Sequence, residues 1–352
     1  MVDLSNIMEI EKILLTGASG FAGSHMLKHL YTTTNHLITC PFTYTHGGHP
    51  ERITSIVGDI DTSRVQLIKS DLASKQFLSS MAEKNFDVII NFASESHVDR
   101  SILNPHDFMS NNTNLMINLL EYARNLPNLK LFLHISTDEV FGSLKSSITN
   151  QEWERPHFPS NPYSASKAAQ EALVISYHKT FNLPITIINI TNMIGEAQNQ
   201  EKYLPKVIRK IHHGQSIQVD TTINGQVGSR KYIHVEDVAI AVSRIMALDL
   251  GELKDKKFQD LPNKYHISGA VELTNLEIVE KVSQIMNKRA RINFAPSPRT
   301  GYDQQYQLSS KKLRDLGWQE KFPIQTRIEQ VVNWTLRNQK WLEIDHGSIR
   351  FN

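Results

Sequence analysis

A tyrosine and a lysine four residues apart are the first residues of this chain whose types and spacing indicate chemistry. Tyr163 and Lys167 stand in the run NPYSASK. On a helix this spacing places both side chains on one face, about 5–6 Å apart at Cβ. A neighbouring ammonium lowers the pKa of a phenol from its usual value of about 10, so Tyr163 could act as a base near neutral pH. A surface Tyr–Lys pair without a catalytic role is the alternative for this spacing taken alone.

A hydroxyl and two carboxyls follow the apolar run LKLFLHI, which ends at residue 135. Thr137, Asp138 and Glu139 would then lie at the carboxyl end of a strand, where open α/β sheets bind their ligands. Thr137 can orient a substrate hydroxyl. Asp138 and Glu139 can serve as acid and base if their surroundings separate their pKa values. A solvated acidic turn is the alternative, and the place at the strand end favours a site.

Three glycines, Gly17, Gly20 and Gly23, connect the apolar run KILLT to a helix-forming segment. Glycines at this spacing permit a tight turn and let a pyrophosphate approach the amides of a helix N-terminus. Phe21 and Ala22 stand between the last two glycines and belong to the same expected cofactor site. The alternative is a glycine-rich turn that binds no ligand.

The residue that usually selects NAD is missing. An acid for the adenosine ribose is expected about 20 residues after the glycine loop, but the second strand ends in LITCP, with Cys40 in that place. No arginine follows at once to hold the 2′-phosphate of NADP, which favours NAD. Asp71, followed by Leu72, is the next acidic residue and is expected at the adenine edge.

Strands and helices alternate through the first half of the chain, which predicts an α/β fold, a Rossmann-like doubly wound parallel sheet with right-handed crossovers. The expected strands are Lys12–Thr16, Leu37–Cys40, Val65–Lys69, Asp87–Phe92, Leu129–Ile135 and Pro184–Ile190. The expected helices are Ser24–Tyr31, Asn111–Asn125 and Tyr163–Thr180.

The alternation weakens after about residue 192, which predicts a smaller, interleaved C-terminal domain. We expect a first domain over 1–191 and a second over 192–352, with segments near 230–247 and 264–268 returning to the first. The later elements are expected to be helices at Tyr203–His213, Glu236–Ala247, Leu273–Met286 and Ile324–Asn338, a strand at Lys264–Ser268 and a loop at Ala295–Gly301.

The composition excludes several classes of protein. The 352 residues include 38 Lys and Arg against 36 Asp and Glu, which argues against a broad nucleic-acid-binding face. A single cysteine cannot form an internal disulfide or a thiolate zinc cluster, and no metal site is expected. No apolar run is long enough to cross a membrane, and the first residues do not form a signal peptide. A cytoplasmic enzyme fits these limits.

Several motifs together resemble the extended short-chain dehydrogenases/reductases, and more closely the nucleotide-sugar 4,6-dehydratases. The similarity runs from residue 12 to about 318 and includes the glycine loop, FASESHVDRS at 92–101, STDEVFG at 136–142, YSASK at 163–167, EKYLP at 201–205 and YIHVED at 232–237. SHVDRS and TDEV are specific to the dehydratases. The other motifs also occur in epimerases, decarboxylases and reductases.

The resemblance implies a three-step, NAD-dependent reaction on a nucleotide-diphosphohexose, dTDP-glucose or UDP-glucose. Tyr163 takes the proton of the sugar 4-hydroxyl, which Thr137 holds, while hydride leaves C4. Glu139 then removes the C5 proton and Asp138 protonates the departing 6-hydroxyl. Hydride returns to C6 and a proton is added back at C5, giving the 4-keto-6-deoxy sugar. Lys167 would also bind the nicotinamide ribose.

The resemblance also implies binding residues and an assembly. The substrate would contact Ser96, Thr137, Asn192, Lys202, Arg230 and Arg299. Guanidinium groups bind phosphate in a bidentate manner, which supports the two arginines. The cofactor would contact Ala93 in addition to the glycine loop, Asp71, Leu72, Tyr163 and Lys167. A homodimer packed through the long helices is expected, with no nucleic-acid or membrane partner.

Two other functions are open. A nucleotide-sugar 4-epimerase or uronate decarboxylase would share the scaffold, but the Asp138–Glu139 pair argues against it. A catalytically inactive cofactor-binding protein is opposed by the presence of both Tyr163 and Lys167. Three departures from the family pattern leave the nucleotide base and the hexose open: Phe141 in place of tyrosine, TNMIGE at 191–196 and RTGYDQQY at 299–306.

Overall fold

The chain forms two compact units, each assembled from three segments. The structure is a computed structural model that describes residues 10–45, 47–82, 84–143, 152–153, 156–250, 260–297, 305–306 and 308–343. Unit 1 spans 1–137, 161–189 and 238–265, and unit 2 spans 138–160, 190–237 and 266–352. The assignment of the cofactor to residues 1–191 and of the substrate to residues 192–352 stays a prediction.

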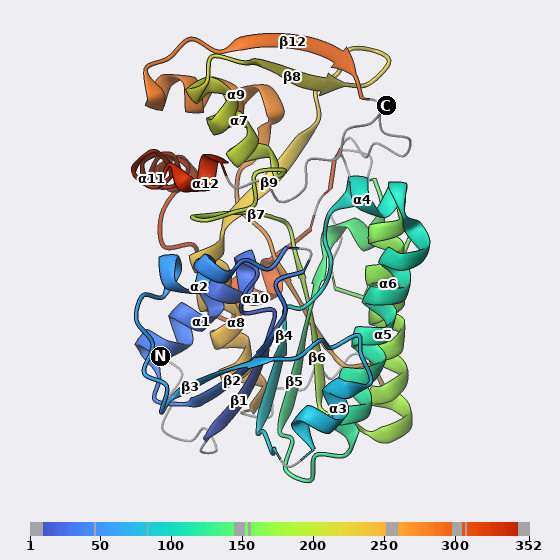
Figure 1. Cartoon of the computed structure of the whole chain (residues 1–352). Helices are drawn as coiled ribbons and strands as arrows, with labels where there is room; N and C mark the ends of the chain where they lie inside the picture. Colours follow the sequence, from blue (N-terminus) through green and yellow to red (C-terminus); the bar gives the residue numbers. More distant parts are fainter. Residues whose placement is uncertain are drawn as a thin grey trace. The chain divides into compact units, whose positions relative to one another are not determined.

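Unit 1 is built on a seven-stranded sheet with the order β10-β6-β5-β4-β1-β2-β3 (Figure 1). The strands are β1 Lys12–Thr16, β2 Leu37–Phe42, β3 Val65–Lys69, β4 Val88–Asn91, β5 Leu131–Thr137, β6 Ile185–Ile190 and β10 Asn263–Ile267. The neighbours from β3 through β2, β1 and β4 to β5 pair in parallel. β4, β5 and β6 are buried along their whole length, as expected for strands covered on both faces. The predicted fold class is confirmed.

Helices connect these strands. They are α1 Phe21–Thr33, α2 Pro50–Ile56, α3 Gln76–Met81, α4 Val98–Leu103, α5 Pro105–Arg124, α6 Pro162–Phe181 and α8 Val235–Leu250, whose first three residues belong to unit 2. The two longest helices, α5 and α6, pack side by side (Figure 1).

The start of α6 is determined by its own sequence. Asn161 caps the helix by accepting a hydrogen bond from the Ser164 amide at 2.9 Å, and Ser164 Oγ accepts one from the Asn161 amide at 3.1 Å. Pro162 occupies the first turn, where its missing N–H costs nothing. This capping box places Tyr163 in the first turn of the helix.

Unit 2 contains two small sheets and a helical layer. β7 Asn192–Ile194, β9 Ser229–His234 and β11 Glu272–Thr274 form one sheet in the order β11-β9-β7, and β8 Ser216–Thr221 pairs in parallel with β12 Arg291–Pro296. The helices are α7 Tyr203–His212, α9 Asn275–Met286, α10 Lys311–Asp315, α11 Ile324–Arg337 and α12 Lys340–Glu343. Side chains of α7, α9 and α11 form most of its apolar core.

Several boundaries differ from those expected, and the largest difference is in α5, which begins at Pro105 rather than at Asn111. The first helix begins at Phe21 rather than Ser24, directly after the glycine loop. Leu273 and Thr274 belong to β11, and Thr274 caps α9 through a capping box with Glu277. The loop predicted at Ala295–Gly301 was wrong at its start, since β12 continues to Pro296; proline is tolerated at the end of an exposed edge strand, which needs no further ladder bond.

No helix in the described part of the chain is both long and apolar enough to cross a membrane.

Candidate active site

The glycine loop forms a tight turn that side chains would block. Gly17 has φ +73°, and a Cβ on it would come within 2.8 Å of the backbone of Phe92 and Ala93. A Cβ on Gly23 would lie 2.1 Å from the Gly17 carbonyl oxygen. Gly20 is the N-cap of α1 and no side chain caps this helix. The amides of the first turn, where Phe21 and Ala22 lie, therefore form a cradle that fits a pyrophosphate.

Polar contacts tie the ends of β1 and β4 together beside this loop. Thr16 Oγ1 donates a hydrogen bond to Asn91 Oδ1 at 2.6 Å. The Ala93 amide donates to both side chains at 3.2 Å. Ala93 is thereby held at the carboxyl edge of the sheet, where the sequence places it as a cofactor residue.

The residues near the expected adenosine end of the cofactor site differ from what the sequence suggests. Cys40 is fully buried in β2, and burial raises the pKa of its thiol, so it stays neutral. The sequence analysis missed Arg52 of α2, a fully buried residue whose Nη1 donates to the carbonyls of Ser19 at 2.9 Å and Gly47 at 2.6 Å. Arg52 thus braces the glycine loop against the segment after β2. An arginine placed 12 residues beyond Cys40 gives no local signal of such a contact.

Asp71 and Leu72 follow β3 directly. Asp71 is exposed and accepts a hydrogen bond from the Ala73 amide at 2.9 Å, while Leu72 is buried. Their predicted contact with adenine stays a prediction.

The proposed catalytic pair lies in the first two turns of α6. Tyr163 is 9% exposed; its amide donates to Ser101 Oγ at 3.1 Å, and its ring meets Phe108 edge to face. Lys167 is 3% exposed, and its Nζ donates to the Ile135 carbonyl at 2.8 Å and to Gln170 Oε1 at 2.7 Å. Burial lowers the pKa of Lys167 to about 7, against the opposing effect of Glu171. Lys167 can therefore gain or lose its proton near neutral pH.

Asn112 of α5 connects the segments around the Tyr163–Lys167 pair, and nothing in the sequence indicated this role. Its Nδ2 donates to Ser166 Oγ at 2.9 Å and to the Glu95 carbonyl at 3.0 Å, and its Oδ1 accepts from the Glu95 amide at 2.8 Å. These bonds connect α6 to the segment after β4, which contains the exposed Ser96. The contacts join residues 17 and 54 positions apart, beyond the range of helix periodicity.

The hydroxyl and the two carboxyls follow β5 as expected. Thr137 ends this buried strand, and its carbonyl accepts a hydrogen bond from Asn189 Nδ2 at 2.9 Å. Asp138 is buried and Glu139 partly exposed in a short 3₁₀ turn, Asp138–Phe141, which belongs to unit 2. Tyr163 and Lys167 belong to unit 1, so how the carboxyls act with this pair stays a prediction.

The predicted substrate residues other than Ser96 and Thr137 fall in unit 2. Asn192 begins β7 and pairs in register with Tyr232 of β9. Lys202 is the N-cap of α7. Arg230 of β9 stacks its guanidinium 4.7 Å from the centre of the Tyr306 ring. Arg299 lies outside the described residues.

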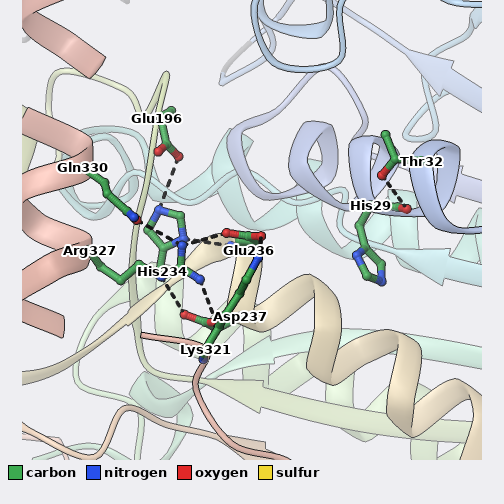
Figure 2. A network of polar contacts seen from close by, with 9 residues as sticks. All are labelled: His29, Thr32, Glu196, His234, Glu236, Asp237, Lys321, Arg327 and Gln330. Atoms are coloured by element: carbon green, nitrogen blue, oxygen red, sulfur yellow. Dashed lines mark hydrogen bonds and ion pairs between the residues drawn. The ribbon is translucent and has the colours of Figure 1, made fainter. Parts of the chain in front are cut away.

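A network of charged side chains secures the end of β9 in unit 2 (Figure 2). Arg327 of α11 donates to both carboxylate oxygens of Asp237, at 2.9 and 3.1 Å, and to Glu236 at 2.7 Å. His234 accepts from the Glu236 amide through Nδ1, and its Nε2 lies 3.3 Å from Glu196 Oε2. The network fixes the strand that carries Arg230.

Known proteins resemble this chain over nearly its whole length. Residues 14–331 match the family model described as GDP-mannose 4,6 dehydratase. This chain belongs to that family. The Low-salt glycan biosynthesis protein Agl12 of Haloferax volcanii is 31% identical over 326 residues, which are 92% of this chain and 98% of that protein. The dTDP-glucose 4,6-dehydratase of Xanthomonas campestris pv. campestris is 31% identical over 358 residues, 96% and 97% of the two chains.

A solved structure agrees with these sequence matches. DesIV, a dTDP-glucose 4,6-dehydratase from Streptomyces venezuelae with NAD and TYD bound, is 27% identical, has a TM-score of 0.82, and is matched over 94% of this chain and 98% of its own. The predicted family is confirmed. The predicted enzyme class, a hydro-lyase, and the predicted cofactor NAD are confirmed at the level of this family.

Proposed function

We propose that this protein catalyses the NAD-dependent dehydration of a nucleotide-diphosphohexose to its 4-keto-6-deoxy sugar, with dTDP-glucose as the first substrate to test and UDP-glucose as the second. The observation that carries the proposal is the Asp138–Glu139 pair directly after β5, which supports dehydration over simple oxidation or epimerisation. The Tyr163–Lys167 pair, buried on one helix of unit 1, supports the oxidation step. The family relatives named dTDP-glucose 4,6-dehydratase support the choice of substrate.

The glycine cradle at α1 and Ala93 would hold NAD, together with Lys167. The bound cofactor would supply reversible hydride transfer, from C4 and back to C6. Tyr163 acts as the phenolate, which the Lys167 ammonium stabilises, and becomes a neutral phenol when it takes the proton of the 4-hydroxyl. Thr137 would orient the same hydroxyl.

Elimination needs an acid and a base once C4 is a carbonyl. The 4-keto group acidifies the C5 proton, which Glu139 removes. Asp138 protonates the 6-hydroxyl as it leaves as water. Burial of Asp138 and partial exposure of Glu139 give the two carboxyls different surroundings, which is what separate acid and base roles require.

The nucleotide half of the substrate would bind Asn192, Lys202, Arg230 and Arg299, with Ser96 and Thr137 nearer the sugar. Stacking on Tyr306 orients the guanidinium of Arg230. We further propose a cytoplasmic homodimer packed through the long helices α5 and α6. Light scattering on the purified protein measures the mass and would contradict the dimer by reporting a monomer.

Incubation with dTDP-glucose and UDP-glucose in separate reactions tests the function. Mass spectrometry should show the loss of one water from one of them, and in deuterated water the product should carry deuterium at C5. Glu139→Gln should keep the oxidation step, accumulate the reduced cofactor and the 4-keto sugar, and form little product. Inversion at C4 without loss of water would replace dehydration with the epimerase function, and loss of carbon dioxide from a uronate would replace it with decarboxylation.

A further inference from the structure

A carboxylate one turn beyond Lys167 is the anion that acts on this lysine from its own helix. Glu171 is fully buried, and the i, i+4 spacing puts it on the same face of α6 as Lys167. Its Oε1 accepts hydrogen bonds from Ser136 Oγ at 2.5 Å and from Asn189 Nδ2 at 2.7 Å. These bonds come from β5 and β6, so the sheet holds the carboxylate in one position.

A lysine from another element binds this carboxylate. Lys264 of β10 is 1% exposed, and its Nζ lies 2.9 Å from Glu171 Oε2. Inside unit 1, Glu171 thus forms an ion pair with Lys264, while its charge also favours the ammonium of Lys167. Lys264 forms the direct ion pair with Glu171, whereas Lys167 donates to a backbone carbonyl and to the neutral amide of Gln170.

We propose that Glu171 and Lys264 form a positioning pair that sets the charge of Lys167. Glu171 favours the ammonium form of Lys167 beside Tyr163. Lys264 weakens this effect because it pairs with the same carboxylate. The inference rests on the proposed function, which gives Lys167 its part in activating Tyr163. It adds two residues that act on the reaction only through Lys167.

The charges near Lys167 come from two strands and from its own helix. Glu171 and the phenol of Tyr163 lie on α6, Lys264 lies on β10, and His134 lies on β5. Burial, together with the charges of Lys167 and Lys264, lowers the pKa of His134 well below its usual range, so its ring is neutral. Glu171 is thus the anion, and Lys264 the competing cation, that can be removed one at a time.

Opposite changes in charge should move the titration of Lys167 in opposite directions. Lys264→Met removes a cation and frees Glu171, so the midpoint of Lys167 should rise by about one pH unit or more. Glu171→Gln removes the anion, so the midpoint should fall by about one pH unit or more. NMR of isotope-labelled lysine side chains measures the midpoint, with the signal assigned from its absence in Lys167→Met.

The double variant Glu171→Gln/Lys264→Met protects the test against misfolding. A buried lysine without its partner strongly destabilises a protein, whereas replacing both partners is often neutral. If Glu171→Gln does not fold, comparing the double variant with Lys264→Met gives the effect of Glu171 on a folded background. The midpoint should be lower in the double variant than in Lys264→Met.

Turnover provides a second measurement. If the wild type dehydrates a nucleotide sugar, the loss of kcat at high pH should move in the same two directions as the Lys167 midpoint. Midpoints that stay unchanged, or that move in the same direction in both folded single variants, would overturn the positioning role. The NMR titration needs no substrate, so absence of dehydration would refute the proposed function while leaving this test intact.

Discussion

In unit 1, Glu171 forms an ion pair with Lys264 and acts through its charge on Lys167, and all three side chains are almost completely buried. In unit 2, Arg327 faces two carboxylates, Asp237 and Glu236, and the network reaches solvent through Glu236 and Lys321, which are 40% and 52% exposed.

This difference separates a network suited to proton transfer from one suited to stability. Burial lowers the pKa of Lys167 to about 7, and the charge of Glu171 opposes this shift only in part. Burial also opposes the charge of Arg327, but hydrogen bonds and ion pairs with Asp237 and Glu236 outweigh it and raise the pKa of this guanidinium. Arg327 therefore stays charged and connects α11 to the start of α8.

Removing the phenol beside the unit 1 network should have the largest effect. Tyr163→Phe should keep the fold and the bound NAD but lower turnover by about 10²–10⁴-fold, because the general base is lost. Tyr177→Phe, a change on the same helix to a partly exposed tyrosine that binds Glu121, is the matched control and should keep normal turnover. Steady-state kinetics measures both, and near-normal rates for Tyr163→Phe would remove it from the reaction.

Breaking the unit 2 network should act on stability. Arg327→Met leaves Asp237 buried without its cation, so the free energy of unfolding should fall by about 3–5 kcal/mol. Chemical denaturation of the wild type and the variant measures this difference. A loss below about 1 kcal/mol, the size typical of exposed ion pairs, would show that burial does not make the Arg327–Asp237 pair stronger than an exposed pair.

Lys167 should also make stability depend on pH. The folded protein releases this proton at a pKa of about 7, while the unfolded chain keeps it up to the ordinary value of 10.5. The unfolded state binds more protons between these values, so stability should rise with pH there, by up to about 1.4 kcal/mol per unit. Lys167→Met should lack this contribution, and unfolding curves of both proteins at pH 7 and above measure the difference. Equal pH dependence in the two proteins would contradict a titrating Lys167.

The smallest effect is expected at the exposed end of the unit 2 network. Lys321 Nζ lies 3.1 Å from Glu236 Oε1, but both side chains are well exposed. Lys321→Ala should lower the free energy of unfolding by about 0.2–1 kcal/mol, and added salt should reduce that loss further. A loss as large as that of Arg327→Met would show that the network acts as one unit rather than through its buried pair.

The sequence by itself determined the features that depend on short spacings. The glycine loop, the Tyr163–Lys167 pair and the capping box of α6 join residues a few positions apart, and helix and turn geometry relate such residues in the same way in any protein. The alternation of strands and helices determined the parallel sheet for the same reason. The family motifs extended this prediction to the carboxyls after β5.

Only the tertiary structure decided which distant residues meet and what surrounds them. Lys264 is 93 positions from Glu171, and Arg52 is 33 positions from Ser19, so their contacts depend on the order of strands and on the path of the loops. The fold also buries Cys40, where the sequence offered it as a substitute for an acid. Burial determines whether a charge is kept, and it is a property of the packed chain, because the cost of removing a charge from water depends on every neighbour it gains.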